Sequence, residues 1–513
     1  MVTMAATGSR RRQRGVALAC LLGGLSVFAA LAWVSNASAA NWRVERTLQS
    51  AATYTDNAKH TDKDPEGAII LRVTPGVTVR SEESRRVQGF LQYGLSGVAR
   101  FGDDESTDIL HRLNAIGKVQ LIEDVLAIDG LARVSQELIS LDGPLVEAEI
   151  SNQNRATVGT YSIGPHLKKR LGTFALADAR YTASGTLREN DSTGNSSANT
   201  VTAALTDGTR FNDVSWGLHY FYREAYNRRY ADSTFERAYA SLGYALTRKF
   251  RVFGTAGEEW NDYLSIRAMD GSSWSAGIGW SPGRRTSVEG SVGERFFGKT
   301  YNVSARHRTR ASNWHLRYYE DLSDTSLFRL TTGTVYDYRC GDTFFEDWPY
   351  STPPSSDCTL WGVGGSGLLF DLQSGVFVSK VLRAGVGWGT GKLHYALDVY
   401  DSTREFQSID SEDRTQGVTA TATYHVAPRT RLNASLGKSR YDVTSASTGR
   451  LFAPLPGRRE RSDDIYNLII GLTHQADSRT SGTITYRHQY RDSNVLGGDF
   501  TENRITGTVN MSF

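Results

Sequence analysis

Hydrophobic and polar residues alternate along most of this chain, and the last residues show the pattern most clearly. From position 505 to 513, apolar or small residues occupy every second position and polar residues lie between them. A period of two predicts a β-strand with one apolar and one polar face. Ile505, Val509, Met511 and Phe513 lie on the apolar face, so the chain ends on an aromatic residue.

The same alternation recurs in pairs of predicted strands that are joined by short polar turns. Such turns include 281–285, 427–429 and 476–479, where Pro, Gly or Asp supplies the turn chemistry. If the apolar face meets lipid, turning a strand over would place arginine in the bilayer at a cost of about 2–4 kcal/mol. The polar face therefore lines an interior. The candidate lumen-facing residues are Thr419, Thr421, Thr423, Arg431, Asn433 and Arg487.

Longer polar connections alternate with these turns, at 57–66, 190–198, 401–414, 444–463 and 492–498. Short periplasmic turns and longer extracellular loops are typical of outer-membrane barrels. We therefore predict an all-β fold, a transmembrane antiparallel up-and-down barrel of about 22 strands, within a range of roughly 16 to 24. The apolar residues of the last strand then form a C-terminal barrel signal. A soluble exported propeller or solenoid is the alternative, because its strands also alternate.

The N-terminus has the features of a Sec signal peptide. Four arginines between positions 10 and 14 precede an uncharged apolar segment, 16–34, and the small residues Ala37, Ser38 and Ala39 follow it. We expect cleavage after residue 39, which leaves residues 40–513 as a single barrel domain. An uncleaved membrane anchor is the alternative. The expected location is the outer membrane of a Gram-negative bacterium, reached through the periplasm, with membrane lipid and the barrel-assembly machinery as partners.

Composition and charge narrow the class of protein further. The chain holds 50 Gly and 54 aromatic residues, and 39% of its residues are hydrophobic. No second long apolar segment follows the signal, which argues against a helical membrane protein. Residues 40–513 carry 54 basic and 55 acidic side chains, a net charge of −1. This balance gives no electrostatic basis for binding nucleic acid.

The segment 324–375 departs from the hairpin pattern and is expected to be irregular. It is predicted to be either an extracellular excursion or a loop that folds into the lumen and constricts it. Cys340 and Cys358 lie in it, and they are the only cysteines after the signal peptide. Because export passes through an oxidising compartment, we predict a disulfide between them, worth about 3 kcal/mol. Free or metal-binding thiols are the alternative.

Motifs for catalysis or cofactor binding are absent from the sequence. The ten histidines form no HxH or HxxxH spacing, and no phosphate-binding loop or nucleophile elbow is present. We therefore predict no metal site, no cofactor and no enzymatic activity. A barrel-embedded hydrolase stays open as an alternative, because its catalytic residues would meet only in the folded protein.

Several short motifs resemble an uncharacterised family of outer-membrane β-barrels associated with PEP-CTERM/exosortase systems. They are 54–57 (YTDN), 73–76 (VTPG), 377–384 (FVSKVLRA), the 424–437 hairpin and the C-terminal strand. The Cys340 to Cys358 segment has no counterpart in this resemblance. The resemblance implies a role in exopolysaccharide or surface-matrix export, with exopolysaccharide and export-system proteins as partners, and it implies no catalytic residues.

These observations lead to a functional hypothesis of transport or assembly. Predicted strands begin almost at the cleavage site, which does not favour a plugged, energy-coupled receptor. The mixed, nearly neutral polar face suits hydrated, hydroxyl-rich chains, with aromatic faces for sugar rings. We expect a non-enzymatic barrel that serves as a pore or scaffold in exopolysaccharide export or assembly. A general diffusion porin or a specific solute channel is the main alternative.

Overall fold

The computed structural model describes residues 41–513 except 83–85, 103–104, 140–146, 152, 190–194, 229–230, 326–334, 341–342, 349–357, 365–374 and 446–458. The predicted signal peptide, 1–39, lies outside the described residues. Within the described part of the chain, no helix is long and apolar enough to cross a membrane.

Twenty-two of the strands form one antiparallel sheet in which neighbours along the chain pair with each other. They are β1 (Asn41–Thr55), β2 (Ala68–Glu82), β3 (Val87–Phe101), β4 (Ser106–Ile122), β5 (Leu126–Leu138), β6 (Arg155–Leu171), β7 (Ala175–Arg188), β8 (Ser196–Asp207), β9 (Val214–Asn227), β10 (Ser233–Thr247), β11 (Phe250–Asp262), β12 (Gly271–Gly283), β13 (Thr286–Arg295), β14 (Gly298–Arg308), β15 (Ser312–Asp324), β19 (Val376–Thr390), β20 (Leu393–Phe406), β21 (Glu412–Ala427), β22 (Thr430–Ser445), β23 (Arg459–Gln475), β24 (Thr480–Ser493) and β25 (Phe500–Ser512).

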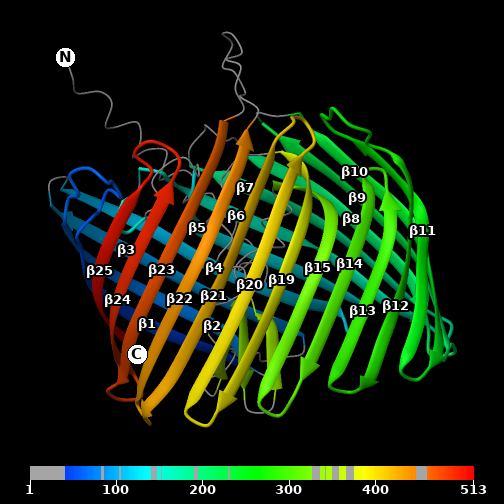
Figure 1. Cartoon of the computed structure of the whole chain (residues 1–513). Helices are drawn as coiled ribbons and strands as arrows, with labels where there is room; N and C mark the ends of the chain where they lie inside the picture. Colours follow the sequence, from blue (N-terminus) through cyan, green and yellow to red (C-terminus); the bar gives the residue numbers. More distant parts are fainter. Residues whose placement is uncertain are drawn as a thin grey trace.

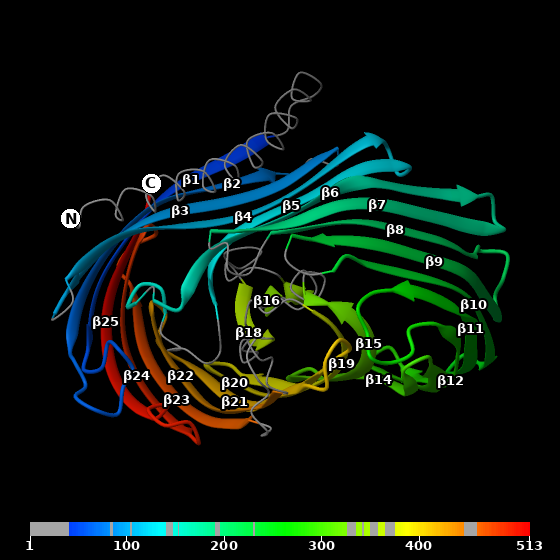
Figure 2. The ribbon, with the colours of Figure 1, turned by 90° about the horizontal axis from the view of Figure 1, so that it is seen from above.

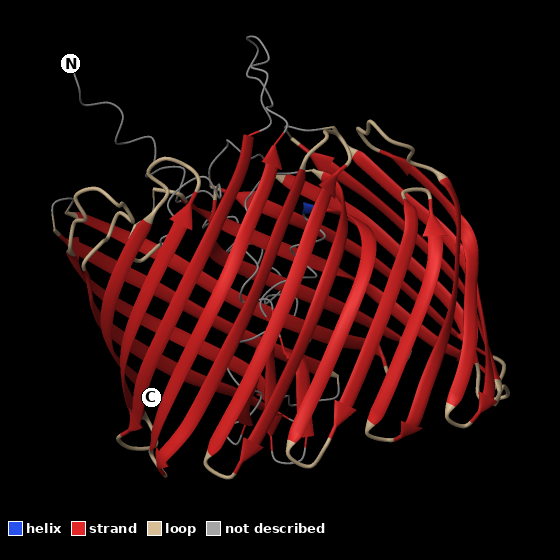
Figure 3. Ribbon diagram, viewed as in Figure 1, coloured by secondary structure: helices blue, strands red, loops and turns tan. Residues whose placement is uncertain are grey.

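Pairing between the first and last strands closes the sheet into a barrel. β1 and β25 run antiparallel from the pair Thr47 and Ser512 to the pair Thr55 and Arg504. Figure 1 shows the tilted strands that form the wall, and Figure 3 shows the short turns at one end and the longer connections at the other. The predicted fold class and the strand number of 22 are confirmed. We call the end with the long connections the loop end and the opposite end the turn end.

The outer surface of the barrel is apolar at alternate positions. Leu436 and Ile484 expose 61% and 63% of their surface, far more than apolar residues in the core of a water-soluble protein do. The aromatic residues Trp280, Trp314 and Trp388 are also exposed, and they lie near the turn end of their strands. An apolar band flanked by aromatic side chains is the arrangement that a bilayer requires of a barrel.

The position of Ile484 allows a test of which face meets lipid. Replacing Ile484 with arginine is expected to lower the free energy of unfolding in bilayers by about 2–4 kcal/mol, because the charge enters the hydrocarbon region. The neighbouring Thr485→Arg variant faces the lumen and is the matched control. Denaturant unfolding of both variants in lipid vesicles measures the difference. Equal losses would contradict the assignment of the two faces.

Several strands extend beyond the length that a bilayer requires. The barrel strands contain 10 to 17 residues, and because about 9–11 residues span the membrane, the longer strands project beyond it. β20 and β21 cover most of 401–414, so the prediction of a long loop there was wrong and only 407–411 connects the strands. The extensions carry ion pairs on both faces, such as Arg404–Asp413 and Arg414–Asp401. Polar residues on both faces remove the alternation that would have revealed the strand.

A second, three-stranded sheet lies inside the barrel. It consists of β16 (Val335–Cys340), β17 (Thr343–Trp348) and β18 (Cys358–Gly364), with β16 in the centre. β18 lies close to β19 and β20 of the wall, and Figure 2 shows β16 and β18 enclosed by the ring of strands. The segment 324–375 was expected to be irregular, and this expectation was wrong for the residues that form β16, β17 and β18. Its alternation is too short to distinguish three brief strands from loop.

The backbone register of the small sheet bears on the predicted disulfide. Cys340 of β16 lies directly opposite Cys358 of β18. Antiparallel partners have Cα atoms about 4.5–5.5 Å apart, which falls within the range that a disulfide needs. The disulfide stays a prediction. We expect mass spectrometry of protease fragments to find the two cysteine peptides joined before reduction and separate after it, and separate peptides without reductant would contradict the prediction.

Candidate functional site

Five arginines on the inner face of the wall surround one short turn near the loop end. They are Arg72 of β2, Arg100 of β3, Arg112 of β4, Arg487 of β24 and Arg504 of β25. We call these residues the arginine cluster. The turn they contact consists of residues 147–150 of the β5–β6 connection, and we call it the acidic turn because it contains Glu147 and Glu149. The closed sheet places strands from both ends of the chain around a turn that follows β5 in the sequence.

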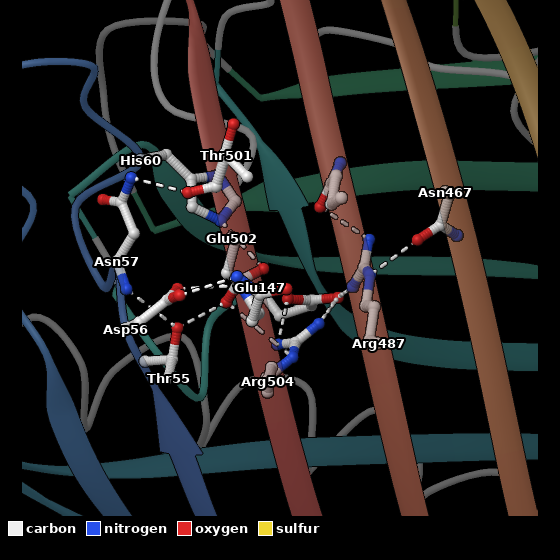
Figure 4. Close-up of polar contacts among 12 residues, drawn as sticks. Thr55, Asp56, Asn57, His60, Glu147, Asn467, Arg487, Thr501, Glu502 and Arg504 are labelled. Carbon is white, nitrogen blue, oxygen red and sulfur yellow. Dashed lines mark hydrogen bonds and ion pairs between the residues drawn. The ribbon is translucent and has the colours of Figure 1, made fainter.

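Glu147 is held by arginines from two adjacent strands. Arg504 donates two hydrogen bonds to its carboxylate, from Nη1 to Oε2 at 2.7 Å and from Nη2 to Oε1 at 3.0 Å. Arg487 Nη1 donates to Oε1 as well. Asn467 and Gln489 each accept a hydrogen bond from Arg487 at 2.9 Å and fix its orientation. Figure 4 shows Glu147 between the two guanidinium groups.

The rest of the acidic turn binds the opposite part of the cluster. Arg72 Nη1 lies 2.9 Å from Glu149 Oε1, and Arg112 Nη2 lies 3.8 Å from the same oxygen. Arg100 donates to two main-chain carbonyls, those of Ala148 at 2.7 Å and Glu149 at 2.9 Å. Both carboxylates of the turn therefore form ion pairs with the arginine cluster, and two of its carbonyl groups accept hydrogen bonds from Arg100.

An apolar contact anchors the end of the acidic turn. Ile150 is buried against Ile70 of β2 and Val98 of β3, which lie on the inner face of those strands. The backbone bonds of the turn are internal, since the amides of Ile150 and Ser151 both donate to the carbonyl of Glu147. Side chains therefore hold the turn against the wall.

The arginines determine the protonation of Glu147. Partial removal from water alone would raise the pKa of this carboxyl, but the charges of Arg487 and Arg504 and the hydrogen bond from Arg504 outweigh that effect and hold the pKa well below its ordinary value. A carboxyl whose pKa is lower in the docked state adds stability that is fully present above its ordinary pKa of 4.5 and is lost as the pH falls through the lowered value.

This linkage predicts how docking of the acidic turn depends on pH. We expect docking to be constant from neutral pH down to about pH 4.5 and to weaken only in more acid solution. The pH dependence of the single-channel current of the refolded protein measures this, with Glu147→Gln as the control that lacks the titrating group. A midpoint near neutral pH would contradict the assignment to Glu147.

The first connection, between β1 and β2, also folds onto the inner wall at this end. Asn57 Nδ2 donates to the carbonyl of Thr501 at 3.0 Å, and Thr55 Oγ1 donates to Glu502 Oε1 at 2.8 Å. The ring of His60 stacks on Phe500 with centroids 3.9 Å apart, and its Nε2 lies 3.2 Å from the fully buried Glu502. Figure 4 shows that this group adjoins Arg504 and the acidic turn.

A third element, which we call the flap, comes from β15 and β19. It consists of residues 319–324 and 376–381. β14 pairs with β15 only as far as Tyr318, so beyond that residue β15 has β19 as its sole strand neighbour among the described residues. Leu322 and Val378 of the flap pack against Phe235 of β10 and Tyr263 of the β11–β12 connection. β10 and β15 are not neighbours in the barrel, so the flap bends away from β14 toward the inside of the barrel.

An ion pair fixes the tip of the flap. Asp324 accepts hydrogen bonds from Arg223 of β9, from Nε at 2.7 Å and from Nη2 at 3.3 Å. The side chains of Arg223 and Asp324 are 1% and 8% exposed, so the pair is shielded from water. Elsewhere at the loop end, Leu138 of β5 is buried against Tyr441 of β22, another contact between strands that are not neighbours. These contacts narrow the mouth of the barrel.

A small cavity lies beside the tip of the flap. It has a volume of about 80 Å³, and its lining includes Ser196, Ser233, Tyr263 and Asp324. The hydroxyl groups of the two serines and of Tyr263 are buried and make no hydrogen bond to another described residue. Buried hydroxyls normally have a partner, so these groups are suited to a small polar molecule.

Of the predicted lumen-facing residues, only Arg487 belongs to the arginine cluster. Arg487 binds Glu147, whereas Thr423 donates to Asn433 at 3.1 Å on another part of the wall. Arg431 is opposite His425, and Thr419 and Thr421 lie on the same strand as Thr423. The C-terminal residues Ile505, Val509, Met511 and Phe513 are exposed on the outer face of β25. Their role as a barrel signal stays a prediction.

Sequence reasoning missed Glu147, Glu149 and most of the arginine cluster. Arg72 and Arg504 occupy positions on the polar face of their alternating strands, and this was an available signal. The acidic turn has no periodic pattern, so the sequence held no signal for Glu147 and Glu149. Among the residues that the structure describes, no group of three or more His, Cys, Asp or Glu side chains is arranged to hold a metal ion.

Comparisons with known proteins support the fold. No protein-family model and no curated protein matches the sequence. The structure is similar to the FrpB iron transporter from Neisseria meningitidis (F3-3 variant), with a TM-score of 0.50 and 11% identity over 94% of this chain and 82% of that one. The apoprotein form of its F5-1 variant gives 0.50 and 10% identity, over 92% and 81%. The siderophore receptor PirA from Acinetobacter baumannii gives 0.49 and 8%, over 93% and 81%.

At this level of identity the similarity concerns the fold alone. The chain has the architecture of Gram-negative outer-membrane barrels.

Proposed function

We propose that this protein is a gated, non-enzymatic outer-membrane transport barrel. The observation that carries the proposal is the occupation of its loop end by three inward-folded elements: the acidic turn, the first connection and the flap. The flap is continuous with β19, which pairs with β20 of the wall. Side chains make the contacts that hold the acidic turn and the flap tip in place, as in the ion pairs of Glu147 and Asp324. Side-chain contacts can break without disrupting the hydrogen-bonded wall, which is what a gate requires.

The proposed cargo is a hydrated, hydroxyl-rich chain, and the proposed context is exopolysaccharide or surface-matrix export. Two features support this. The inner face carries both charged groups and the hydroxyl pairs Thr53–Thr506 and Thr74–Ser96, which suit sugar hydroxyls. The sequence motifs given above resemble barrels associated with PEP-CTERM/exosortase systems, and export-system proteins are the corresponding partners.

A specific solute channel is the second candidate. The cavity beside the flap favours it, because three buried hydroxyl groups there make no hydrogen bond to another residue that the structure describes, and they would suit a small polar solute. The solved barrels with a TM-score of 0.50 are described as iron transporters, which is compatible with solute passage.

Planar-bilayer recording of the refolded full-length protein tests the proposal. We expect a low resting conductance with brief openings, because the gate elements are docked, and block of these openings by added polysaccharide. Block by monosaccharides alone would favour the solute channel. A heat-modifiable, correctly folded barrel that never conducts, even when Asp324 is replaced, would overturn the proposal of a transport pore.

A further inference from the structure

We infer that the arginine cluster is a binding site for a chain that carries carboxylate groups, and that the acidic turn occupies this site as an internal substitute. The inference rests on the proposed function and specifies its substrate class: acidic polysaccharides built from uronic acids, in preference to neutral ones. Its basis is the way the wall binds Glu147 and Glu149.

The geometry at Glu147 is that of carboxylate recognition. Arg504 makes two parallel bonds to the two oxygens, and Arg487 adds a third from the adjacent strand. A planar guanidinium matches a carboxylate in this way, and the match does not depend on the molecule that bears the carboxylate. The same site can therefore accept the carboxylate of another chain.

The site offers two such positions on one turn. Glu149 lies two residues after Glu147, and Arg72 and Arg112 bind it from β2 and β4. Arginines on different strands thus bind two carboxylates that lie two residues apart. Arg100 adds hydrogen bonds to two neutral groups, the main-chain carbonyls of Ala148 and Glu149. Alternating carboxylate and neutral oxygen groups are also what a chain of acidic sugars presents.

Charge balance requires that an anion replaces the turn when it leaves. Among the described residues, the carboxylates that remain in ion pairs with the five guanidinium groups would then be Asp108 and Glu502. The side chains of Arg100, Arg487 and Arg504 are 7%, 18% and 11% exposed. Exposing so many partly buried positive charges without counter-charge is unfavourable. A neutral chain cannot compensate for the loss, but a polycarboxylate can.

The turn is accessible to competition. The Glu147 side chain keeps 38% of its surface open although its arginines are largely buried. The backbone hydrogen bonds of the turn are internal, so its departure breaks no strand pairing. Exchange of one carboxylate for another at the arginines is therefore a local event within an intact barrel.

Comparison of an acidic with a neutral polymer tests the inference. Polygalacturonate and dextran of matched length are added to the refolded full-length protein, with binding measured in detergent and channel block measured in bilayers. We expect polygalacturonate to bind and dextran to bind far more weakly. In the Glu147→Gln, Glu149→Gln double variant, the apparent affinity for polygalacturonate should rise roughly tenfold to a hundredfold, because weaker docking of the turn removes the competitor.

A second variant keeps the inference testable if the double variant folds poorly. The Arg112 side chain is 73% exposed, so Arg112→Gln should leave folding unaffected and weaken polygalacturonate binding a few-fold. Asp464→Asn, which alters an ion pair with Lys438 away from the cluster, is the matched control and should change nothing.

The outcomes separate this inference from the proposed function. Equal binding of polygalacturonate and dextran would overturn the inference even if the protein conducts. Selective polygalacturonate binding in detergent without any conductance would support the site and reject the pore. An unchanged polygalacturonate affinity in both the double variant and Arg112→Gln would also overturn the inference.

Discussion

Replacing Asp324 with alanine is expected to lower the free energy of unfolding by about 3–5 kcal/mol and to open the barrel. The change leaves the guanidinium of Arg223, whose side chain is 1% exposed, without the carboxylate that neutralises it at 2.7 Å. Removing one partner of a buried pair costs far more than the pair contributes, because the remaining charge stays out of water. Denaturant unfolding in vesicles measures the stability, and bilayer recording measures the conductance.

The flap gives this prediction its functional consequence. The ion pair joins β9 to the tip of β15, two strands that are not neighbours in the barrel, and Leu322 of the same flap packs on Phe235 of β10. We expect the Asp324→Ala variant to show longer openings than the wild type. Glu289→Ala, which removes an exposed pair with Arg251 near the turn end, is the control and should alter neither quantity. A stable variant with wild-type gating would show that the flap does not close the pore.

The sequence predicted the barrel because lipid imposes its pattern directly. A strand that crosses the bilayer must place apolar residues at every second position. The alternation from Ile505 to Phe513 therefore predicts a strand and also predicts which of its faces meets lipid. That constraint ends where the strand leaves the membrane. For this reason Arg404 and Asp413, which are paired strand residues, were assigned to a loop.

The site was harder to predict, because its members are brought together only by closure of the barrel. Glu147 and Arg487 are 340 residues apart in the sequence, and Glu147 and Arg504 are 357 apart. No local spacing reports such a contact. Arg487 was assigned to the lumen because alternation fixes the face of a residue, but alternation says nothing of what lies opposite it.

Asp463 of β23 is a second buried carboxylate whose replacement should have a large effect. Its Oδ2 accepts hydrogen bonds from Arg461 Nε at 2.8 Å and from Arg491 Nη2 at 2.7 Å, and its side chain is 1% exposed. Asp463→Asn removes the negative charge and leaves two buried guanidinium groups close together. We expect the free energy of unfolding to fall by about 3–5 kcal/mol.

The adjacent residue supplies a control that isolates burial from charge. Asp464 pairs with Lys438 at 3.5 Å on the other face of β23, where both side chains contact solvent. Asp464→Asn makes the same chemical change one position away, and exposed pairs contribute little because water and salt screen them. We therefore expect unfolding in vesicles to distinguish the two variants clearly at low and at high salt. Similar losses in both variants would mean that the charge of the mouth as a whole, rather than the shielded contact of Asp463 with Arg461 and Arg491, stabilises this part of the wall.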